Sequence, residues 1–382
     1  MTDAAVETGD LNEDQIQQAF TEGYDEALEA LGRFNLAIVG DTGVGKSTLV
    51  NAIFGSDRAA TGIGAPITVG TEYHLRDDQT FGVWDFQGFE HGAQATPVET
   101  LRKGLKANQS EDPERAIHVA WFCWDASGAR LTEGHRLLIR ALADAGIPVI
   151  GVLTKVHKRG ELIKSDHLRF AEYLEGENLG FADPHVYLTA ALADAEFGLE
   201  THGLKKLLHA TIALAPEAAK DAARRAQVID AKLKRNLAWK WISAASASAA
   251  VIAATPIPVA SAAVLAPLQL GMFGKIAAIY GLKMKDILGG GASFQVLLQL
   301  TGKAAAMSLV KFVPVAGSVI NASVASVWTA AAGEAWRRMC EQAAKGDLKV
   351  KTFQEFRSTF GPVVEALFKS WMERGGKPEA PQ

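Results

Sequence analysis

Short apolar segments alternate with amphipathic segments between residues 34 and 213. The apolar segments have the length of buried strands, and the amphipathic segments repeat their apolar positions at helical spacing. Candidate strands span residues 34–40, 71–76, 81–86, 116–124, 148–154 and 184–189. The second and third form a predicted hairpin, with Asp77, Asp78 and Gln79 at its turn. This alternation predicts a three-layer α/β domain with a largely parallel sheet.

The two flanks of this region have a helical pattern. Residues 13–31 carry apolar side chains at helical spacing, and beyond residue 213 the composition changes to long polar and then uncharged runs. Residues 216–240 predict a polar helix, and residues 352–374 predict an amphipathic one. The predicted organisation is an N-terminal helical segment (1–32), an α/β domain (33–213), an α-helical domain (214–374) and a disordered tail (375–382).

Residues 241–274 contain no charged side chain, and two prolines interrupt them near the middle. Each half is shorter than the roughly 20 apolar residues that span a bilayer, so a helical hairpin is favoured over two spans. A similar uncharged run follows Phe312, which predicts two related hairpin-like units. Trp239 and Trp241 beside basic residues favour a membrane interface, whereas the abundant alanine and serine favour a compact bundle. The sequence leaves both readings open.

Composition narrows the range of partners. The 382 residues suffice for two domains, and a net charge of -4 argues against general nucleic-acid binding, so no nucleic acid is expected as a partner. The two cysteines, Cys123 and Cys340, have no metal-ligand spacing, which favours packing roles in a reducing compartment. The polar N-terminus has no secretory pattern, so the chain is expected in the cytoplasm, peripheral to or embedded at the inner membrane if the hairpins insert.

One motif carries most of the functional prediction. Residues 40–47 read GDTGVGKS, which matches the phosphate-binding loop G-x-x-x-x-G-K-[ST], and they lie between a predicted strand and a predicted helix. In this motif the backbone wraps a phosphate at the positive end of a helix, Lys46 reaches the terminal phosphates, and Ser47 ligates magnesium. The residues expected to contact the nucleotide are Asp41, Thr42, Gly43, Val44, Gly45, Lys46, Ser47 and Thr48.

With this loop, residues 33–213 resemble GTPases with small Ras-like heads. The resemblance is closer to the TrmE-Era-EngA-septin-like branch, which includes Era and the immunity-related GTPases, and the helical region resembles an uncharacterised domain appended to some bacterial Era-like GTPases. The resemblance implies Mg2+ as cofactor and GTP and GDP as substrate and product. It also implies that Thr68 senses the γ-phosphate and the magnesium, with Thr61 and Thr71 as alternatives.

Residues 85–88 resemble the D-x-x-G element that ends a strand in this family. Asp85 would then hold magnesium, together with Ser47 and Thr68, and the Gly88 amide would meet the γ-phosphate. Lys46, Thr68 and Gly88 are therefore the predicted catalytic residues. Phe89 stands where Ras-like enzymes carry the water-orienting glutamine, which implies slow turnover without help from a partner or a second protomer.

Base recognition follows the family pattern only in part. Thr154, Lys155 and His157 occupy an element that resembles [N/T]-K-x-D, but a histidine replaces the aspartate that accepts hydrogen bonds from guanine. Thr189 and Ala190 resemble the later element that contacts guanine through a backbone amide. GTP is the first choice, and ATP or relaxed specificity stays open.

The predicted function is a Mg-dependent GTPase that acts as a molecular switch coupled to the helical domain. Guanine nucleotide is the expected ligand, and a membrane surface and a second copy of the chain are candidate partners. The alternative is a poorly hydrolysing module for membrane interaction or self-assembly, or an ATP-using P-loop protein.

Overall fold

The structure is a computed structural model that describes residues 13–55, 66–68, 71–86, 113–128, 130–254, 260–282, 318–347 and 353–380. By its internal contacts the chain divides into two compact units. One, here the helical unit, comprises Met1–Ala30 and Lys232–Gln382; the other, the α/β unit, comprises Leu31–Ala231. The N-terminal helix therefore belongs with the C-terminal helices, and residues 214–231, which the sequence pattern grouped with the helical domain, belong with the sheet.

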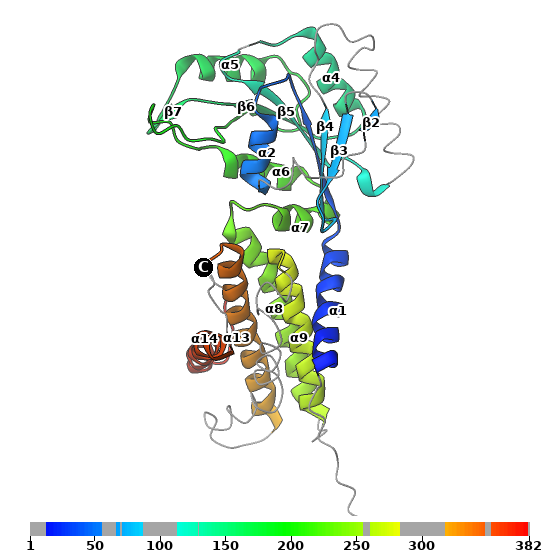
Figure 1. Ribbon diagram of the computed structural model, residues 1–382, viewed down its shortest axis with the longest axis vertical. Coiled ribbons are helices and arrows are strands. Elements are labelled where there is room, and N and C mark those ends of the chain that lie inside the picture. The colour runs from blue at the N-terminus through cyan, green and yellow to red at the C-terminus, as the bar shows by residue number, and fades with distance from the viewer. Residues whose placement is uncertain are drawn as a thin grey trace, which may run out of the picture. The chain divides into compact units, whose positions relative to one another are not determined.

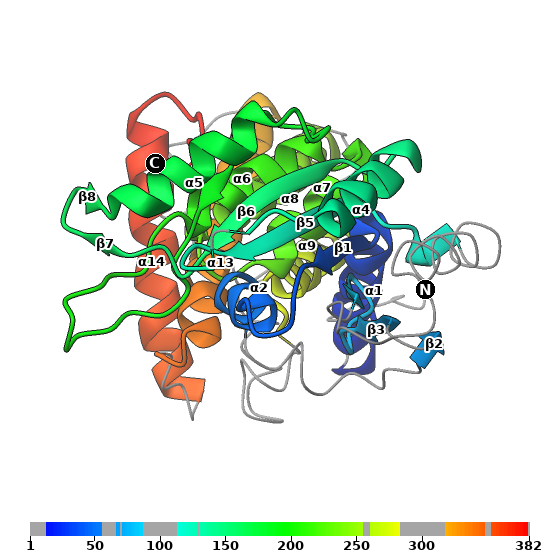
Figure 2. The same ribbon diagram turned by 90° about the horizontal axis from the view of Figure 1, so that it is seen from above.

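Seven described strands of the α/β unit form one sheet in the order β2-β3-β4-β1-β5-β6-β9. Their bounds are β1 Phe34–Val39, β2 Pro66–Thr68, β3 Thr71–Leu75, β4 Phe81–Phe86, β5 Val119–Asp125, β6 Val149–Thr154 and β9 Tyr187–Leu188. Neighbouring strands are parallel from β4 through β1, β5 and β6 to β9. The pairs β2 with β3 and β3 with β4 are antiparallel. Figure 2 shows β1, β5 and β6 lying side by side. The predicted α/β fold with a largely parallel sheet is confirmed.

Figure 1 labels the α-helices of this unit as α2, α4, α5, α6 and α7. The helices are α2 Lys46–Phe54, η2 Pro113–Arg115, α4 Glu133–Asp144, α5 Ser165–Gly176, α6 Leu204–Leu214 and α7 Glu217–Ala226. A core on one face of the sheet joins Phe122 and Trp124 of β5 to Leu138 of α4 and Leu174 of α5. On the other face, Trp121 stacks with Phe54 of α2. These alternating positions on β5 explain why the strand is apolar throughout.

The predicted hairpin is confirmed, because β3 and β4 pair antiparallel around the turn that contains Gln79. Gln79 has φ +57°, in the left-handed region that such turns use. The sequence did not indicate β2 or the small hairpin of β7 Lys158–Arg159 and β8 Leu162–Ile163, which have two or three residues each. Strands this short carry too little alternation to stand out from a loop.

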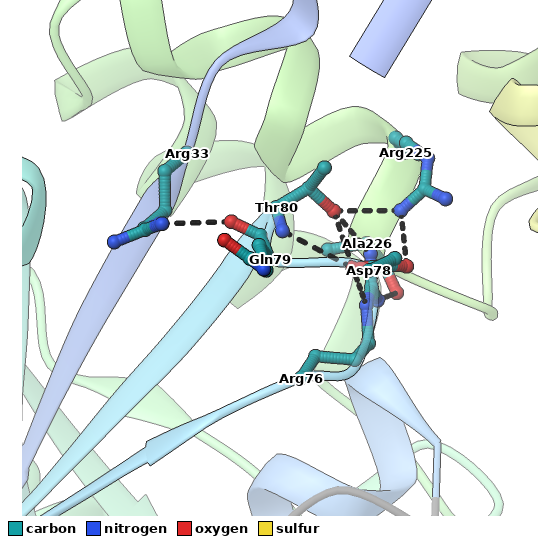
Figure 3. A network of polar contacts seen from close by, with 7 residues as sticks. All are labelled: Arg33, Arg76, Asp78, Gln79, Thr80, Arg225 and Ala226. Atoms are coloured by element: carbon teal, nitrogen blue, oxygen red, sulfur yellow. Dashed lines mark hydrogen bonds and ion pairs between the residues drawn. The ribbon is translucent and has the colours of Figure 1, made fainter. Parts of the chain in front are cut away.

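The turn of this hairpin carries a buried ionic network with α7 (Figure 3). Arg225 is 2% exposed and donates through Nη1 to Asp78 Oδ2 at 2.5 Å and to Thr80 Oγ1 at 2.6 Å. Arg76 donates to Asp78 Oδ1 at 2.7 Å and also contacts the Ala226 carbonyl oxygen. Burial would raise the pKa of Asp78, but Arg225 and Arg76 outweigh it and hold the pKa well below its usual range.

The polar helix predicted for residues 216–240 is wrong as one continuous element. α7 ends at Ala226 and α8 begins at Ala231. Between them Gln227, which is fully buried, donates to the Asp230 carbonyl oxygen at 2.8 Å and accepts from the Asp230 amide at 2.7 Å. A glutamine side chain thus takes the place of the helical hydrogen bonds, a competition that helical periodicity does not reveal.

The helical unit contains α1 Glu13–Leu31, α8 Ala231–Ala254, α9 Ala260–Tyr280, α13 Ser318–Ala344 and α14 Phe353–Glu373. α13 contacts both α9 and α14. Gly274 lets α1 approach α9, since a Cβ there would lie 2.1 Å from the Phe20 carbonyl oxygen. Phe20 and Trp336 join α1 to α13 in an edge-to-face pair. The amphipathic helix predicted for residues 352–374 is confirmed as α14.

The hairpin-like units are described only in part. α8 and α9 flank the proline-containing segment, whereas the helix that would precede α13 lies outside the described residues. Among the described helices, α8 alone is long and apolar enough to cross a membrane, and 33% of its most apolar window is buried within the structure. Trp239 pairs with Trp371, and Trp241 lies under the Lys275 ammonium at 4.8 Å. Both tryptophans therefore have packing partners inside the helical unit.

Candidate nucleotide-binding site

The phosphate-binding loop joins the buried strand β1 to helix α2 at the carboxyl edge of the sheet. Gly40 has φ +143°, and a Cβ at this position would lie 2.2 Å from the Cys123 carbonyl oxygen, so the loop leaves β1 against β5 only with glycine there. Gly45 has φ +96° and caps α2 without any side-chain hydrogen bond. The first backbone N–H groups of α2 thus have no capping side chain, as an anion site requires.

Lys46 is the first residue of α2, and its side chain folds back over the loop. The ammonium donates to the carbonyl oxygens of Gly40 at 2.8 Å and Asp41 at 3.0 Å. These bonds hold a positive charge at the loop, where a bound phosphate would meet it together with the helix dipole. Ser47 follows on the same turn, and its side chain is exposed. The structure thus brings together Lys46, Ser47 and the loop backbone, as the motif predicts.

Asp85 lies near the end of β4, next to β1 in the sheet. Its Oδ1 atom is buried and has no hydrogen-bond partner among the described residues. Burial raises the pKa of this carboxyl, and the positive charge of Lys46 offsets part of that rise. Divalent cations such as Mg2+ prefer oxygen ligands, so an orphaned carboxylate oxygen beside the phosphate-loop lysine fits a magnesium ion. Asp85 and Ser47 are the described residues that would hold it.

A histidine that the sequence did not single out positions the start of the loop. His135 is the third residue of α4 and is 3% exposed. Its Nδ1 accepts the Trp124 indole N–H at 3.1 Å and faces the Thr132 amide at 3.3 Å, so the ring proton lies on Nε2. Nε2 then donates to Asp41 Oδ1 at 3.2 Å. Only the fold brings these residues together, since they lie far apart in sequence.

The end of β6 supplies the other half of the site. Thr154 Oγ1 contacts the carbonyl oxygens of Val44 and Trp124. Lys155 has φ +54°, and its ammonium donates to the Gly43 carbonyl oxygen at 2.7 Å and to Asp125 Oδ2 at 2.7 Å. Thr154 and Lys155 therefore tie β6 directly to the phosphate-binding loop. Asp125 ends the preceding strand β5, a position that the strand pattern could have marked as a candidate.

A pocket of about 190 Å³ opens beside these residues. It is bounded by the start of α2, by residues 154–157 and by residues 189–192 with Leu199. Its position between the phosphate loop and both predicted base-reading elements is where a nucleoside would extend from the loop. The predicted residues Thr48, Thr154, Lys155, His157, Thr189 and Ala190 all line this pocket.

Some residues singled out by the sequence lie outside the described part of the chain, namely Thr61, Gly88 and Phe89. Thr68 is the last residue of β2, where its backbone pairs with Thr71 of β3. It therefore ends a strand adjacent to β3 and β4, and its role as the γ-phosphate sensor stays a prediction.

A match to a protein family covers the region that carries this site. Residues 35–155 match the protein-family model described as 50S ribosome-binding GTPase. No curated protein is similar enough to this chain to count as a match. Similar solved structures include translation elongation factor SelB from Methanococcus maripaludis with a GTP analogue, at 18% identity, 48% of this chain, 35% of that chain and TM-score 0.31. The chain thus spans about a third of that protein's length.

Two further solved structures share this level of similarity. Era from Aquifex aeolicus bound to GDP·AlF4− matches at 17% identity, 60% of this chain, 69% of that chain and TM-score 0.34. Toc33 from Arabidopsis thaliana with Mg2+ and GMPPNP matches at 16% identity, 56% of this chain, 98% of that chain and TM-score 0.33. Together, the phosphate loop, the sheet order and the family match over residues 35–155 show that the α/β unit contains a P-loop GTPase domain.

Proposed function

We propose that the α/β unit binds GTP with Mg2+, hydrolyses it to GDP and phosphate, and acts as a switch on the helical unit. The observation that carries the proposal is that Lys46, held by the carbonyl oxygens of the phosphate loop, exerts its charge on Asp85, whose buried Oδ1 atom has no hydrogen-bond partner among the described residues. A lysine held over an uncapped helix start binds phosphate oxygens, and an unpartnered carboxylate beside it needs a cation. The Asp85 Oδ1 atom has no hydrogen-bond partner among the described residues that would give it a structural role.

Each residue then has a distinct task. Lys46 exchanges its two carbonyl contacts for oxygens of the terminal phosphates, and the α2 amides bind the phosphate ahead of them. Ser47, Asp85 and Thr68 would hold the magnesium, which would neutralise charge on the phosphate oxygens. Thr68 ends β2, so its contact to the γ-phosphate would hold this edge strand, and loss of that phosphate would release it. Turnover is slow because Phe89 cannot orient the attacking water by hydrogen bonding.

The test is equilibrium binding of labelled GTP and GDP to purified protein with Mg2+, followed by phosphate release over time. The wild type should bind both nucleotides and release phosphate slowly, whereas Lys46→Ala should bind GTP about 100-fold more weakly and release no phosphate above background. Lys205→Ala, an exposed lysine on α6, is the matched control and should behave as wild type. A wild type that binds no nucleotide, or a Lys46→Ala variant that binds normally, would overturn the proposal.

A second candidate is a nucleotide-dependent membrane module that scarcely hydrolyses GTP and works at the inner membrane. The observation that favours it is α8, whose length and hydropathy suit a membrane and whose Val251 is 70% exposed. Flotation of the protein with vesicles of anionic phospholipid, in the presence of GTP or GDP, tests this candidate. Co-flotation that depends on the nucleotide supports it, and protein that stays at the bottom of the gradient in both states contradicts it.

A further inference from the structure

The carboxylates at the base end of the site already have partners. Asp125 is held by Lys155 at Oδ2, and its Oδ1 accepts the Ser127 amide at 2.8 Å. Burial would raise the pKa of Asp125, but these bonds outweigh it and keep the carboxyl ionised. In the loop between the lining residues 192 and 199, Asp194 Oδ1 accepts the amides of Glu196 and Phe197. No carboxylate is among the residues that line the pocket.

The backbone donors that the sequence assigned to the base are also engaged. The Ala190 amide donates to the His202 carbonyl oxygen at 3.1 Å, and the His202 amide donates back to Ala190 at 3.1 Å. The Thr189 amide and hydroxyl both donate to the Leu153 carbonyl oxygen, at 2.8 and 2.9 Å. The predicted contact of a free Ala190 amide to guanine therefore does not fit the hydrogen bonds of this structure.

His157 is a lining side chain that can still bind a base. Its ring is exposed, and its nitrogen atoms have no hydrogen bond within the described residues. His167 fixes the position of His157. The His157 amide donates to Nδ1 of the buried His167 at 3.2 Å, and the two rings pack edge to face with their centroids 5.2 Å apart. Burial and the charge of His157 lower the pKa of His167, which favours a neutral His167 ring.

The hydrogen-bonding capacity of the imidazole ring determines which bases this site can distinguish. Guanine offers two adjacent donors, N1–H and the exocyclic amine, and one acceptor, O6, whereas adenine offers an N1 acceptor and an N6 donor. A neutral imidazole has one donor and one acceptor, so it can pair with either base through a single hydrogen bond. Large discrimination arises when the wrong base leaves buried polar groups unpaired. Here the Asp125 carboxylate and the Thr189 and Ala190 amides are satisfied by the protein itself.

We infer that His157 is the base-reading residue of this site and that it makes the site accept guanine and adenine nucleotides with similar affinity. The inference rests on the proposed function, because it takes the pocket as the nucleoside site. The pocket then selects a purine by its shape and apolar lining, with residues such as Leu49, Val156 and Leu199 around the ring. The switch would respond to the nucleoside triphosphates as a class, and their relative concentrations would set which one it carries.

The experiment measures dissociation constants of fluorescent GTP, ATP and ITP with Mg2+ for the full-length wild type, His157→Asp and His157→Ala. ITP keeps guanine's N1–H and O6 but lacks the exocyclic amine. The wild type should bind all three within about tenfold of one another, since one adaptable hydrogen bond is worth about a factor of ten. His157→Asp should raise the preference for GTP over ATP by about 100-fold and over ITP by about tenfold, because a carboxylate accepts from both donors.

His157→Ala is the matched control and should keep the GTP to ATP ratio within about tenfold, because it adds no acceptor. A structural role for His157 would change the affinity for all three nucleotides together and would not shift their ratio. A wild type that prefers GTP over ATP by more than 100-fold overturns the inference and leaves the proposed function standing. A wild type that binds none of the three overturns the proposed function, and this inference with it. The wild-type ratio is decisive even if a variant fails to fold.

Discussion

Two aspartates flank the same strand of the α/β unit, and their pKa values move in opposite directions. Asp78 precedes β4 and Asp85 lies near its end, and both carboxyls are largely removed from solvent. Arg225 and Arg76 surround Asp78 and lower its pKa, whereas Asp85 keeps an orphaned oxygen and its pKa is raised. Burial is common to both, so the permanent partners make the difference. One carboxylate holds the fold together, and the other is left to bind something from outside.

The largest effect on stability is expected from the ionic network around Asp78, before β4. Arg225→Ala leaves Asp78 buried without its main counter-charge, so we expect the free energy of unfolding to fall by about 3–5 kcal/mol. Denaturant titration measures this loss. Arg224→Ala, which removes a more exposed pair with Asp221, is the control and should cost less than about 1 kcal/mol. Equal losses for the two variants would show that the network is not a special stabilising feature.

Lys46→Ala tests the phosphate-binding loop, and its effect is measured on nucleotide affinity instead of on the free energy of unfolding. Two charge-assisted hydrogen bonds to phosphate at about 1.5 kcal/mol each amount to about 3 kcal/mol, so GTP affinity should fall about 100-fold. The loss should be the same for ATP, because the lysine touches only the phosphates. Fluorescence titration of both nucleotides checks this, and a loss confined to one base would mean that the two ends of the pocket are not independent.

The Asp78 carboxylate should make stability depend on acid pH. Its folded-state pKa lies below the ordinary value of 3.8, so it binds fewer protons folded than unfolded and stabilises the protein above that value. As the pH falls from about 5 to about 3, about 1 kcal/mol of this stability should be lost, and the rest is lost as the pH falls further through the folded-state pKa. Comparison of wild type with Asp78→Asn between pH 7 and pH 3 isolates this contribution. A difference that stays constant over this range would contradict the assignment.

The smallest effect on stability is expected at Asp85. Asp85→Asn removes a buried carboxyl whose Oδ1 atom has no hydrogen-bond partner among the described residues, so the protein without nucleotide should unfold within about 1 kcal/mol of wild type, on the stabilised side. Asp78→Asn is the matched variant before the same strand and should destabilise. Thermal melts of the two variants in nucleotide-free buffer make the comparison, and a large loss from Asp85→Asn would assign that residue a structural role.

The sequence predicted the strand, glycine loop and helix of the phosphate-binding loop because that pattern is local. A glycine loop between a strand and a helix fixes Lys46 and Ser47 within eight residues, and alternating apolar runs predicted the sheet. The base end depends on contacts between distant segments. The bond between the Ala190 amide and His202, and the tie from His135 to Asp41, arise only when separate loops meet. Sequence spacing cannot show that a donor is already engaged or that a histidine has a fixed tautomer.

The helical unit shows the same limit. Its helices follow from periodicity, but the break at Gln227 depends on a side chain that replaces backbone hydrogen bonds. From its apolar composition alone, α8 could either enter a membrane or pack in a helical bundle. The contacts of Trp239 and Trp241 with Trp371 and Lys275 give these side chains partners within the unit, which the sequence could not specify.

The most direct test of the account is the magnesium dependence of GTP binding, measured for wild type and Asp85→Asn in Mg2+ and in a chelator. If Asp85 holds the cation, wild type should bind GTP at least tenfold more tightly with Mg2+, and Asp85→Asn should lose most of that gain while it still binds GTP in chelator. Equal affinity of the wild type with and without Mg2+, or a full magnesium response in Asp85→Asn, would contradict the claim that this carboxylate is reserved for the nucleotide's metal.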